Sequence, residues 1–237
     1  MSEPIAGPRL RARLTGLCYL LAIGAGAFDH IFVGGQLVAR SDATATARNI
    51  LGSEQLYRLA FAADLVPVYI VVTILLYGLL KPVNPGLARL ATASSLVGSA
   101  VGSAIALLQF APLVLLRNDP SLSVFSPGQL QGLSLLFLKL HDVGFTISLV
   151  FFGFYCLLIG CLIIGSSFLP KIVGVLMSVA GLAYLTYSLA DFVSPALGAS
   201  LSSVTLMLGG LGEAALTLWL LVVGVNPAKW RAQAGAA

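Results

Sequence analysis

Six long apolar runs, separated by short polar stretches, dominate the hydropathy pattern of the chain. A membrane-spanning helix needs about 20 apolar residues to cross a hydrocarbon core of about 30 Å. Each run meets this requirement, so the pattern predicts an all-α fold, a six-transmembrane-helix bundle. The predicted spans are residues 14–38, 56–80, 90–116, 139–164, 172–192 and 201–225.

Two features interrupt this scheme near the N-terminal end. Ser41–Ser53 combines a candidate N-cap, Ser41, with alanines and a terminating Gly52. These residues predict a short extracytoplasmic helix between spans one and two. Pro67 lies inside the second run, where it removes a backbone donor, so we expect a kink there.

The fourth span poses a length problem. Residues 129–164 have a composition that allows one continuous helix, which would be about 54 Å long at 1.5 Å per residue. We therefore expect the part before Lys139 to lie at the membrane interface or to re-enter the membrane. The scheme makes residues 14–226 one membrane domain between tails at 1–13 and 227–237.

Small residues recur on two of the predicted spans. They occur at the spacing that brings side chains onto one helix face, and such stripes let helices pack closely in membranes. The third span carries Ser94, Gly98, Gly102 and Ala106, and the fifth carries Gly174, Ser178 and Gly181.

Composition agrees with a membrane protein. Hydrophobic residues make up 58% of the chain and charged residues 9%, against roughly 25% charged in soluble domains. The net charge of +4 does not indicate nucleic acid binding, because the basic residues are scattered in short loops. The three cysteines lie in apolar segments, where packing explains them better than disulfides.

The basic residues also predict an orientation. With six spans both termini share one side, which collects most of the lysines and arginines, and the positive-inside rule makes that side cytoplasmic. Arg9, Arg11 and Arg13 before the first run also resemble the start of a secretory signal. Apolar sequence resumes after His30, however, so we favour a retained first span in a plasma membrane.

Nine ionisable residues inside or at the ends of the runs are candidate ligand- or proton-binding residues. Charged groups are costly in a bilayer and normally face a protein interior or a water-filled cavity. Lys139, His141 and Asp142 interrupt the fourth run. The others are Asp29, His30, Arg58, Asp64, Asp191 and Glu213.

The depths of these residues predict a common site. At about 1.5 Å per residue, the acids on spans one, two, four, five and six all fall in the outer half of the membrane. We therefore expect an outward-facing polar cavity, with His141 and Asp142 on one wall and Glu213 as its floor. Lys139 and Asp142, three residues apart on a helix, are expected to form an ion pair.

Simpler explanations exist for each residue. Asp191 and Arg58 lie near the interface, where capping or snorkelling accounts for them. A structural ion pair or hydrogen bond accounts for Asp64 and Glu213, and a helix-start cap accounts for His141 with Asp142. The coincidence of their depths therefore supports a site more strongly than any single residue does.

Five segments carry polar and small residues at recognisable places in apolar sequence. They read SDATATARNILGSEQLYRLAFAADL, LLYGLLKPVN, LKLHDVGFTISLVFFGFYCLLIGCLI, LPKIVGVLMSVAGLAYL and GEAALTLWLLVVGVN. They resemble successive motifs of the bacterial membrane-protein family catalogued as domain of unknown function 4386, over residues 14–226. The resemblance implies a six-pass protein of a family without an assigned activity. The motifs' polar positions fall on Asp42, Glu54, Arg58, Asp64, His141, Asp142 and Glu213.

Two kinds of chemistry fit the candidates. In the first, the cavity binds a small polar or cationic molecule, or passes protons, with Glu213 and Asp64 titrating and His141 as a relay. In the second, zinc held by His141, His30, Asp142 and Glu213 activates water in a lipid hydrolase. Against zinc, the chain has two histidines, which do not share a metal-binding motif.

A third alternative is an accessory protein whose polar groups only set helix register. We favour the binding or proton-linked cavity over an enzyme, and catalytic residues are not assigned. No cofactor is predicted, with zinc as the alternative. The expected partners are membrane lipid and a small polar or cationic ligand, and nucleic acid is not expected.

Overall fold

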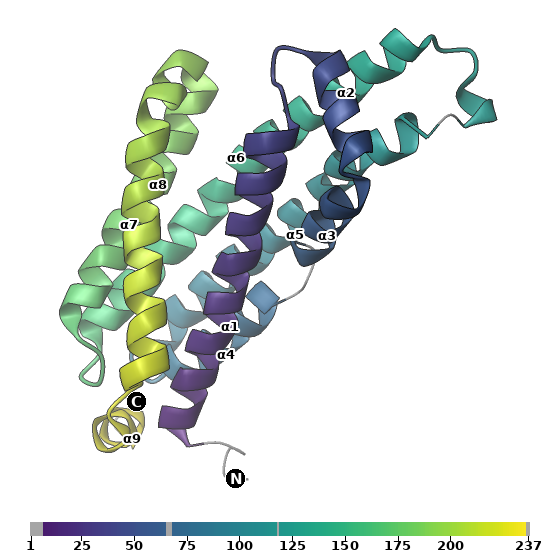
Figure 1. Ribbon diagram of the computed structural model, residues 1–237. Coiled ribbons are helices and arrows are strands. Elements are labelled where there is room, and N and C mark those ends of the chain that lie inside the picture. Colours follow the sequence, from purple (N-terminus) through teal and green to yellow (C-terminus); the bar gives the residue numbers. More distant parts are fainter. Residues whose placement is uncertain (1–6, 65–67, 118, 236–237) are drawn as a thin grey trace. The chain divides into compact units, whose positions relative to one another are not determined.

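The computed structural model describes residues 7–64, 68–117 and 119–235, without the side chain of Asp64. Every regular element in this part of the chain is helical (Figure 1), which confirms the all-α prediction. The N-terminal elements are α1 (Pro8–Asp29), the π-helix η1 (His30–Leu37), α2 (Ala43–Gly52), α3 (Glu54–Asp64), α4 (Val68–Leu80) and α5 (Pro85–Leu115). The 3₁₀ turn η2 (Pro120–Leu122), α6 (Pro127–Gly165), α7 (Lys171–Val193), α8 (Pro195–Leu218), the π-helix η3 (Trp219–Val223) and α9 (Pro227–Gly235) follow.

Six helical stretches are long and apolar enough to cross a membrane, as predicted. They are Pro8–Leu37, Glu54–Leu80, Pro85–Leu115, Pro127–Gly165, Lys171–Val193 and Pro195–Val223. The protein is therefore an integral membrane protein with six spans. The kink expected at Pro67 lies outside the described residues.

Local capping explains where several helices begin. Asp42, and not Ser41 as predicted, is the N-cap of α2, because its carboxylate accepts a hydrogen bond from the Ala45 amide at 2.9 Å. Helix α6 begins with a capping box: the Ser126 amide donates to Gln129 Oε1 at 2.8 Å, and the Gln129 amide donates to Ser126 Oγ. The predicted end of α2 at Gly52 is confirmed.

Helix α6 is continuous over 39 residues, which confirms the helix expected for residues 129–164. Its length exceeds that of a 30 Å crossing by about 19 residues at 1.5 Å per residue. An interfacial or re-entrant path for its first part remains a prediction.

The chain forms two compact units, which we describe separately. Unit 1 comprises residues 1–21, 67–99 and 146–237, and unit 2 comprises residues 22–66 and 100–145. The ranges show that α1, α5 and α6 each contribute to both units.

Close backbone approaches at glycine hold unit 1 together. A Cβ atom placed on Gly174 of α7 would lie 2.8 Å from the carbonyl oxygen of Gly160 on α6. One placed on Gly212 of α8 would lie 2.7 Å from the carbonyl oxygen of Leu176 on α7. Helices α7 and α8 lie side by side (Figure 1). The small-residue face predicted for the fifth span is therefore a packing surface.

The small-residue stripe of the third span is only partly confirmed. On Gly98, in unit 1, a Cβ atom would lie 3.2 Å from Phe151 Cβ, so this glycine is a true packing position. On Gly102, in unit 2, a Cβ atom would meet no described atom within 4 Å. Regular spacing alone does not establish that a neighbouring helix is present.

The C-terminal helix α9 is anchored within unit 1 by side-chain hydrogen bonds. Trp230 Nε1 donates to the Leu79 carbonyl at the end of α4, at 2.8 Å. Gln233 Oε1 accepts from the Ser167 amide and hydroxyl, both at 2.9 Å. Residues after 226, predicted to be a tail, therefore include a docked helix.

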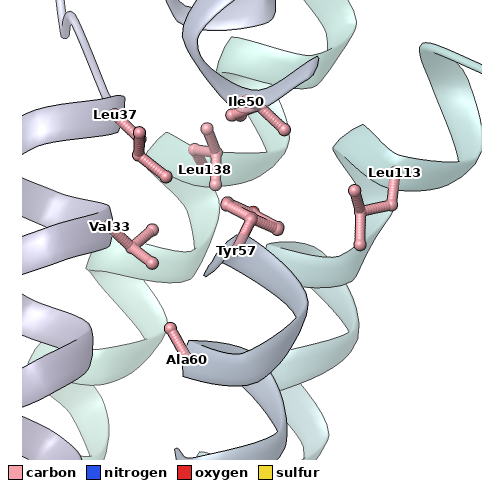
Figure 2. Packing of buried hydrophobic residues seen from close by; sticks show 7 residues of the cluster. All are labelled: Val33, Leu37, Ile50, Tyr57, Ala60, Leu113 and Leu138. Carbon is pink, nitrogen blue, oxygen red and sulfur yellow. The ribbon is translucent and has the colours of Figure 1, made fainter. Parts of the chain in front are cut away.

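Unit 2 is built around an apolar cluster of large side chains, shown in Figure 2. Tyr57 of α3 is at its centre, completely buried, and its hydroxyl donates to the backbone carbonyl of Gln109 on α5. The other members are Val33, Leu37, Ile50, Ala60, Leu113 and Leu138. They come from η1, α2, α3, α5 and α6, so this cluster joins the short α2 helix to four spans.

Candidate functional site

The nine predicted residues fall into both units and do not form one demonstrated cluster. Unit 1 contains Asp191 and Glu213. Unit 2 contains Asp29, His30, Arg58, Asp64, Lys139, His141 and Asp142. None of the charged side chains in the described part of the chain is fully buried, so the structure does not show the expected intramembrane charged cluster.

Glu213 lies on α8 opposite α7. Its Oε1 accepts a hydrogen bond from the Tyr184 hydroxyl of α7 at 2.5 Å. Gly209, one turn before Glu213, makes room for this ring, because a Cβ atom there would overlap the Tyr184 hydroxyl. The glycine and the carboxylate on α8 therefore together position the tyrosine.

Other aromatic residues of unit 1 extend this contact into a cluster. The Tyr19 hydroxyl of α1 lies close to the Glu213 carboxyl group. The Tyr19 ring packs edge-on against the Tyr69 ring of α4, with 5.7 Å between the ring centroids. Phe152 of α6 lies 5.3 Å from the Tyr184 ring and 5.4 Å from the Tyr69 ring. Four spans thus surround the acid with aromatic rings and hydroxyl groups.

The charge of Glu213 has no basic counterpart in the described part of the chain. The ion pairs found there involve other acids, Glu54 and Asp142. A carboxyl group within a membrane span normally finds a cationic partner or holds a proton. Hydroxyl donors satisfy Glu213 in either state, because a tyrosine hydroxyl both donates and accepts.

Asp191, the other unit 1 candidate, lies at the end of α7. Thr146 Oγ1 of α6 donates to its Oδ2 at 3.4 Å. Gly198, in the first turn of α8, leaves room for its side chain, because a Cβ atom there would contact Asp191. This environment agrees with a structural role at a helix end.

In unit 2, Asp142 pairs with Arg40, a residue that the sequence did not single out. The two side chains form a direct ion pair, with exposed fractions of 58% for Arg40 and 43% for Asp142. His141 Nδ1 lies 4.0 Å from Asp142 Oδ1. Lys139 is exposed, and the pairing of Lys139 with Asp142 remains a prediction.

Arg58 belongs to a second ion-pair group. Its Nη2 lies 2.7 Å from Glu54 Oε1 one turn earlier on α3, and Arg117 lies 3.4 Å from the same oxygen. The Arg58 guanidinium also lies 5.8 Å from the Phe110 ring centroid. The charges of Arg58 and Glu54 thus compensate each other within α3, as expected for a structural ion pair near the start of a helix.

Asp29 lies at the junction of α1 and η1. Its Oδ1 accepts a hydrogen bond from Gln109 Nε2 of α5 at 2.7 Å. The third span therefore contributes a neutral polar partner to an acid of unit 2. His30 beside it is exposed.

A metal centre and a common cavity lack support in the described residues. These contain no group of three or more His, Cys, Asp and Glu residues arranged to hold a metal ion. A shallow surface pocket lies at the start of α3, lined by Gly52, Ser53, Glu54, Gln55, Leu56 and Leu59, and includes none of the nine candidates. The side chain of Asp64 lies outside the described part.

Sequence reasoning missed Tyr184, Tyr19, Gln109 and Arg40, which contact the predicted acids. Three of them are neutral and stand in apolar runs, where hydropathy does not distinguish them from packing residues. Hydroxyl and amide residues at the depth of each acid are the signal that would have pointed to the three neutral residues.

A family model matches residues 14–224, most of the chain, and its description is domain of unknown function (DUF4386). The chain belongs to this family. None of the curated proteins compared and none of the solved structures matches it. Membership agrees with a six-span membrane protein and assigns no activity, so a functional argument depends on the residues themselves.

Proposed function

We propose that this DUF4386 protein binds a proton or small cation at Glu213, as part of proton-linked solute transport or sensing in a bacterial plasma membrane. One observation supports this most directly: the Glu213 carboxyl group is bonded to the Tyr184 hydroxyl and has no described basic partner. An acid that is already ion-paired resists protonation, whereas one held by hydroxyl groups exchanges its proton without losing its partners.

The arrangement also favours a proton-binding role for Glu213 over a purely structural role as a hydrogen-bond partner. A register-setting role needs one donor and one acceptor, and a Gln would serve as well as Glu213. The acid instead stands among hydroxyl groups on several helices, with Tyr69 and Tyr19 3.4 Å apart between their oxygens. Acidic side chains within spans are common members of proton relays, and tyrosine hydroxyl groups, which both donate and accept, can continue a hydrogen-bonded path from such an acid.

Infrared difference spectroscopy tests the proposal on protein reconstituted in liposomes. Stepping the pH between about 3 and 9, which brackets ordinary and raised carboxyl pKa values, should change the carbonyl bands of the acids that titrate. Glu213→Gln should remove one component of that change, whereas the matched Glu54→Gln should leave this component in place. A difference spectrum that is unaltered in Glu213→Gln would overturn the assignment.

A flux assay then asks whether the proton crosses the membrane. Liposomes with a trapped pH-sensitive dye should lose an imposed pH gradient faster with the natural protein than with Glu213→Gln. Equal rates, together with a titrating Glu213 band, would restrict the function to sensing or binding.

The proposed topology has both termini in the cytoplasm and a polar cavity that opens outward to Glu213. The orientation of the termini is supported by the excess of basic residues on the side that carries them. In a variant without native cysteines, a new thiol at residue 235 should resist a membrane-impermeant reagent added to intact cells. A thiol introduced at residue 44 should react.

A further inference from the structure

Unit 1 gathers its basic residues at one end. They lie at or near helix ends and in the turns between helices: Arg9, Arg11, Arg13, Lys81, Arg89, Lys171, Lys229 and Arg231. The acids described in this unit are Asp191, near the opposite end of α7, and Glu213, inside α8. Among the described residues, none of these basic side chains forms an ion pair. This end of unit 1 therefore carries positive charge without a described counter-charge.

The arginines of unit 2 are arranged differently. Arg40 pairs with Asp142, and both Arg58 and Arg117 lie within ion-pair distance of Glu54. A basic residue that is paired within its own chain has little charge left for a partner. Unpaired basic residues in a cluster, by contrast, create a positive potential that attracts an anion from outside the protein.

Hydrogen bonds hold the basic end of unit 1 together as one surface. The bond from Trp230 to the Leu79 carbonyl fixes α9 two residues before Lys81. The bonds between Gln233 and Ser167 fix α9 to the turn that leads into α7, which begins at Lys171. The positive-inside rule requires only that basic residues lie on this side of the membrane. The docking of α9 in addition places Lys81 and Lys171 next to a basic helix.

Two arginines of α1 join this surface through backbone contacts. Arg11 Nη1 donates to the Gly78 carbonyl in the last turn of α4 at 3.5 Å, and Arg13 Nη2 donates to the Val222 carbonyl of η3 at 3.2 Å. Carbonyl groups in the last turn of a helix lack a partner within that helix. Both arginines remain positively charged in these contacts, so they add to the charge of the surface while they position it.

Helix α9 has the character of a helix that lies at a membrane interface. It runs across the end of α8 and does not continue it (Figure 1), because the chain turns at Gly224, where φ is 77°. Trp230 and Gln233 share the face that docks, and Lys229 and Arg231 are exposed beside it. A tryptophan flanked by basic residues is typical of helices that lie at the level of the lipid head groups.

We propose that α9 and the adjacent basic turns of unit 1 bind the head groups of anionic phospholipids. The phosphate oxygens of such a lipid accept charge-assisted hydrogen bonds from the exposed side chains of Lys229 and Arg231, with Lys81 and Lys171 nearby. These residues lie at the ends of membrane spans, so a lipid reaches them without leaving the bilayer. The proposal does not depend on the function proposed for Glu213.

Thermal unfolding of the full-length protein in a neutral detergent tests the proposal. Phosphatidylglycerol, which is anionic, should raise the melting temperature in a saturable manner, as a ligand of the folded state does. Phosphatidylcholine with the same acyl chains should not, and neither should soluble glycerol phosphate. Added sodium chloride should weaken the effect of phosphatidylglycerol, because salt screens exposed charges.

Variants locate the effect on α9. Arg231→Gln should raise the half-saturating phosphatidylglycerol concentration about fivefold, and the double variant Lys229→Gln/Arg231→Gln about 25-fold. Lys229→Arg keeps the charge and should respond as the natural protein does. The matched control is Arg48→Gln, which removes an exposed arginine of α2 in unit 2 and should leave the response unchanged.

Native mass spectrometry measures binding directly and keeps the proposal falsifiable if a variant does not fold. The natural protein, released from detergent that contains equal amounts of the two lipids, should retain phosphatidylglycerol in preference to phosphatidylcholine. Equal retention or equal stabilisation by the two lipids would overturn the proposal, as would an unchanged half-saturating concentration in the double variant. Equal stabilisation by glycerol phosphate would show a site for a soluble phosphate instead of a lipid surface.

Discussion

Two acids of unit 2, Asp142 and Glu54, differ from Glu213 of unit 1 in the kind of partner that satisfies them. In unit 2, Asp142 and Glu54 are paired with arginines. In unit 1, Glu213 is bonded to a tyrosine hydroxyl in an aromatic cluster. An arginine keeps a carboxylate ionised, whereas a hydroxyl group is compatible with both protonation states. Asp142 and Glu213, both predicted to lie in the outer half of the membrane, are therefore suited to different roles.

The packing of the two units differs in a parallel way. Unit 1 brings helix backbones together at glycines such as Gly160 and Gly174, whereas unit 2 fills its interior with Tyr57, Leu113 and Leu138 (Figure 2). Backbone contact leaves no room for an added side chain, and a core of large side chains is sensitive to the loss of one. Substitutions that add volume should therefore destabilise unit 1 most, and substitutions that remove volume should destabilise unit 2 most.

The largest effect is expected from adding volume to unit 1. Gly174→Leu would force α6 and α7 apart, because its Cβ would meet the Gly160 backbone, and should destabilise the protein by about 3 kcal/mol. Gly102→Leu, where the Cβ meets no described atom, is the matched control. Equal losses in denaturant unfolding would show that the glycine contacts do not set stability.

Removing volume from unit 2 should have the next largest effect. Leu113→Ala leaves a cavity in the apolar cluster and should cost about 2 kcal/mol, mostly through lost packing, since lipid is as apolar as the core. Leu107→Ala on the same helix removes a side chain that is 72% exposed and should cost little. Similar values for both variants would contradict a packed core in unit 2.

The Glu213 hydrogen bond should contribute little to stability if its role is functional. Tyr184→Phe is expected to cost about 0.6 kcal/mol, the average for side-chain hydrogen bonds within membranes, and to alter the infrared band of Glu213. Tyr77→Phe, the same change elsewhere in unit 1, should do neither. A loss of several kcal/mol without a spectral change would make the bond structural.

The smallest effect is expected at the exposed pair of unit 2. Arg40→Ala should cost about 0.5 kcal/mol or less at low salt, and the difference should shrink as ionic strength rises. Unfolding at two salt concentrations measures this. A salt-independent loss greater than that of Leu113→Ala would mean that Arg40 and Asp142 are more than a surface pair.

Much of the fold was predictable because it depends on local sequence. Spans, the end of α2 at Gly52 and the continuity of α6 follow from apolar run length and from capping residues within a few positions. The choice of Asp42 over Ser41 as N-cap was missed because adjacent residues of similar chemistry compete for one position. The docking of α9 was missed because its anchors, Leu79 and Ser167, are remote in sequence.

The candidate site was predictable only as a set of acids. Their presence in apolar runs marks Asp29, Asp142 and Glu213 as unusual, since charge in a membrane needs compensation. The partner side chain that each acid finds was not predictable from one sequence. Glu213 finds Tyr184 at a separation of 29 residues, and Asp29 finds Gln109 at a separation of 80.

Sequence alone determined that this chain crosses a membrane six times and carries acids within its spans, because hydropathy acts over neighbouring residues along one helix. The tertiary structure decided that Asp142 meets an arginine, Glu213 a tyrosine and Asp29 an amide. Partner choice depends on which helix faces pack together, and close packing is a property of several spans at once. That choice separates an acid that is paired with an arginine from acids that are bonded to neutral groups.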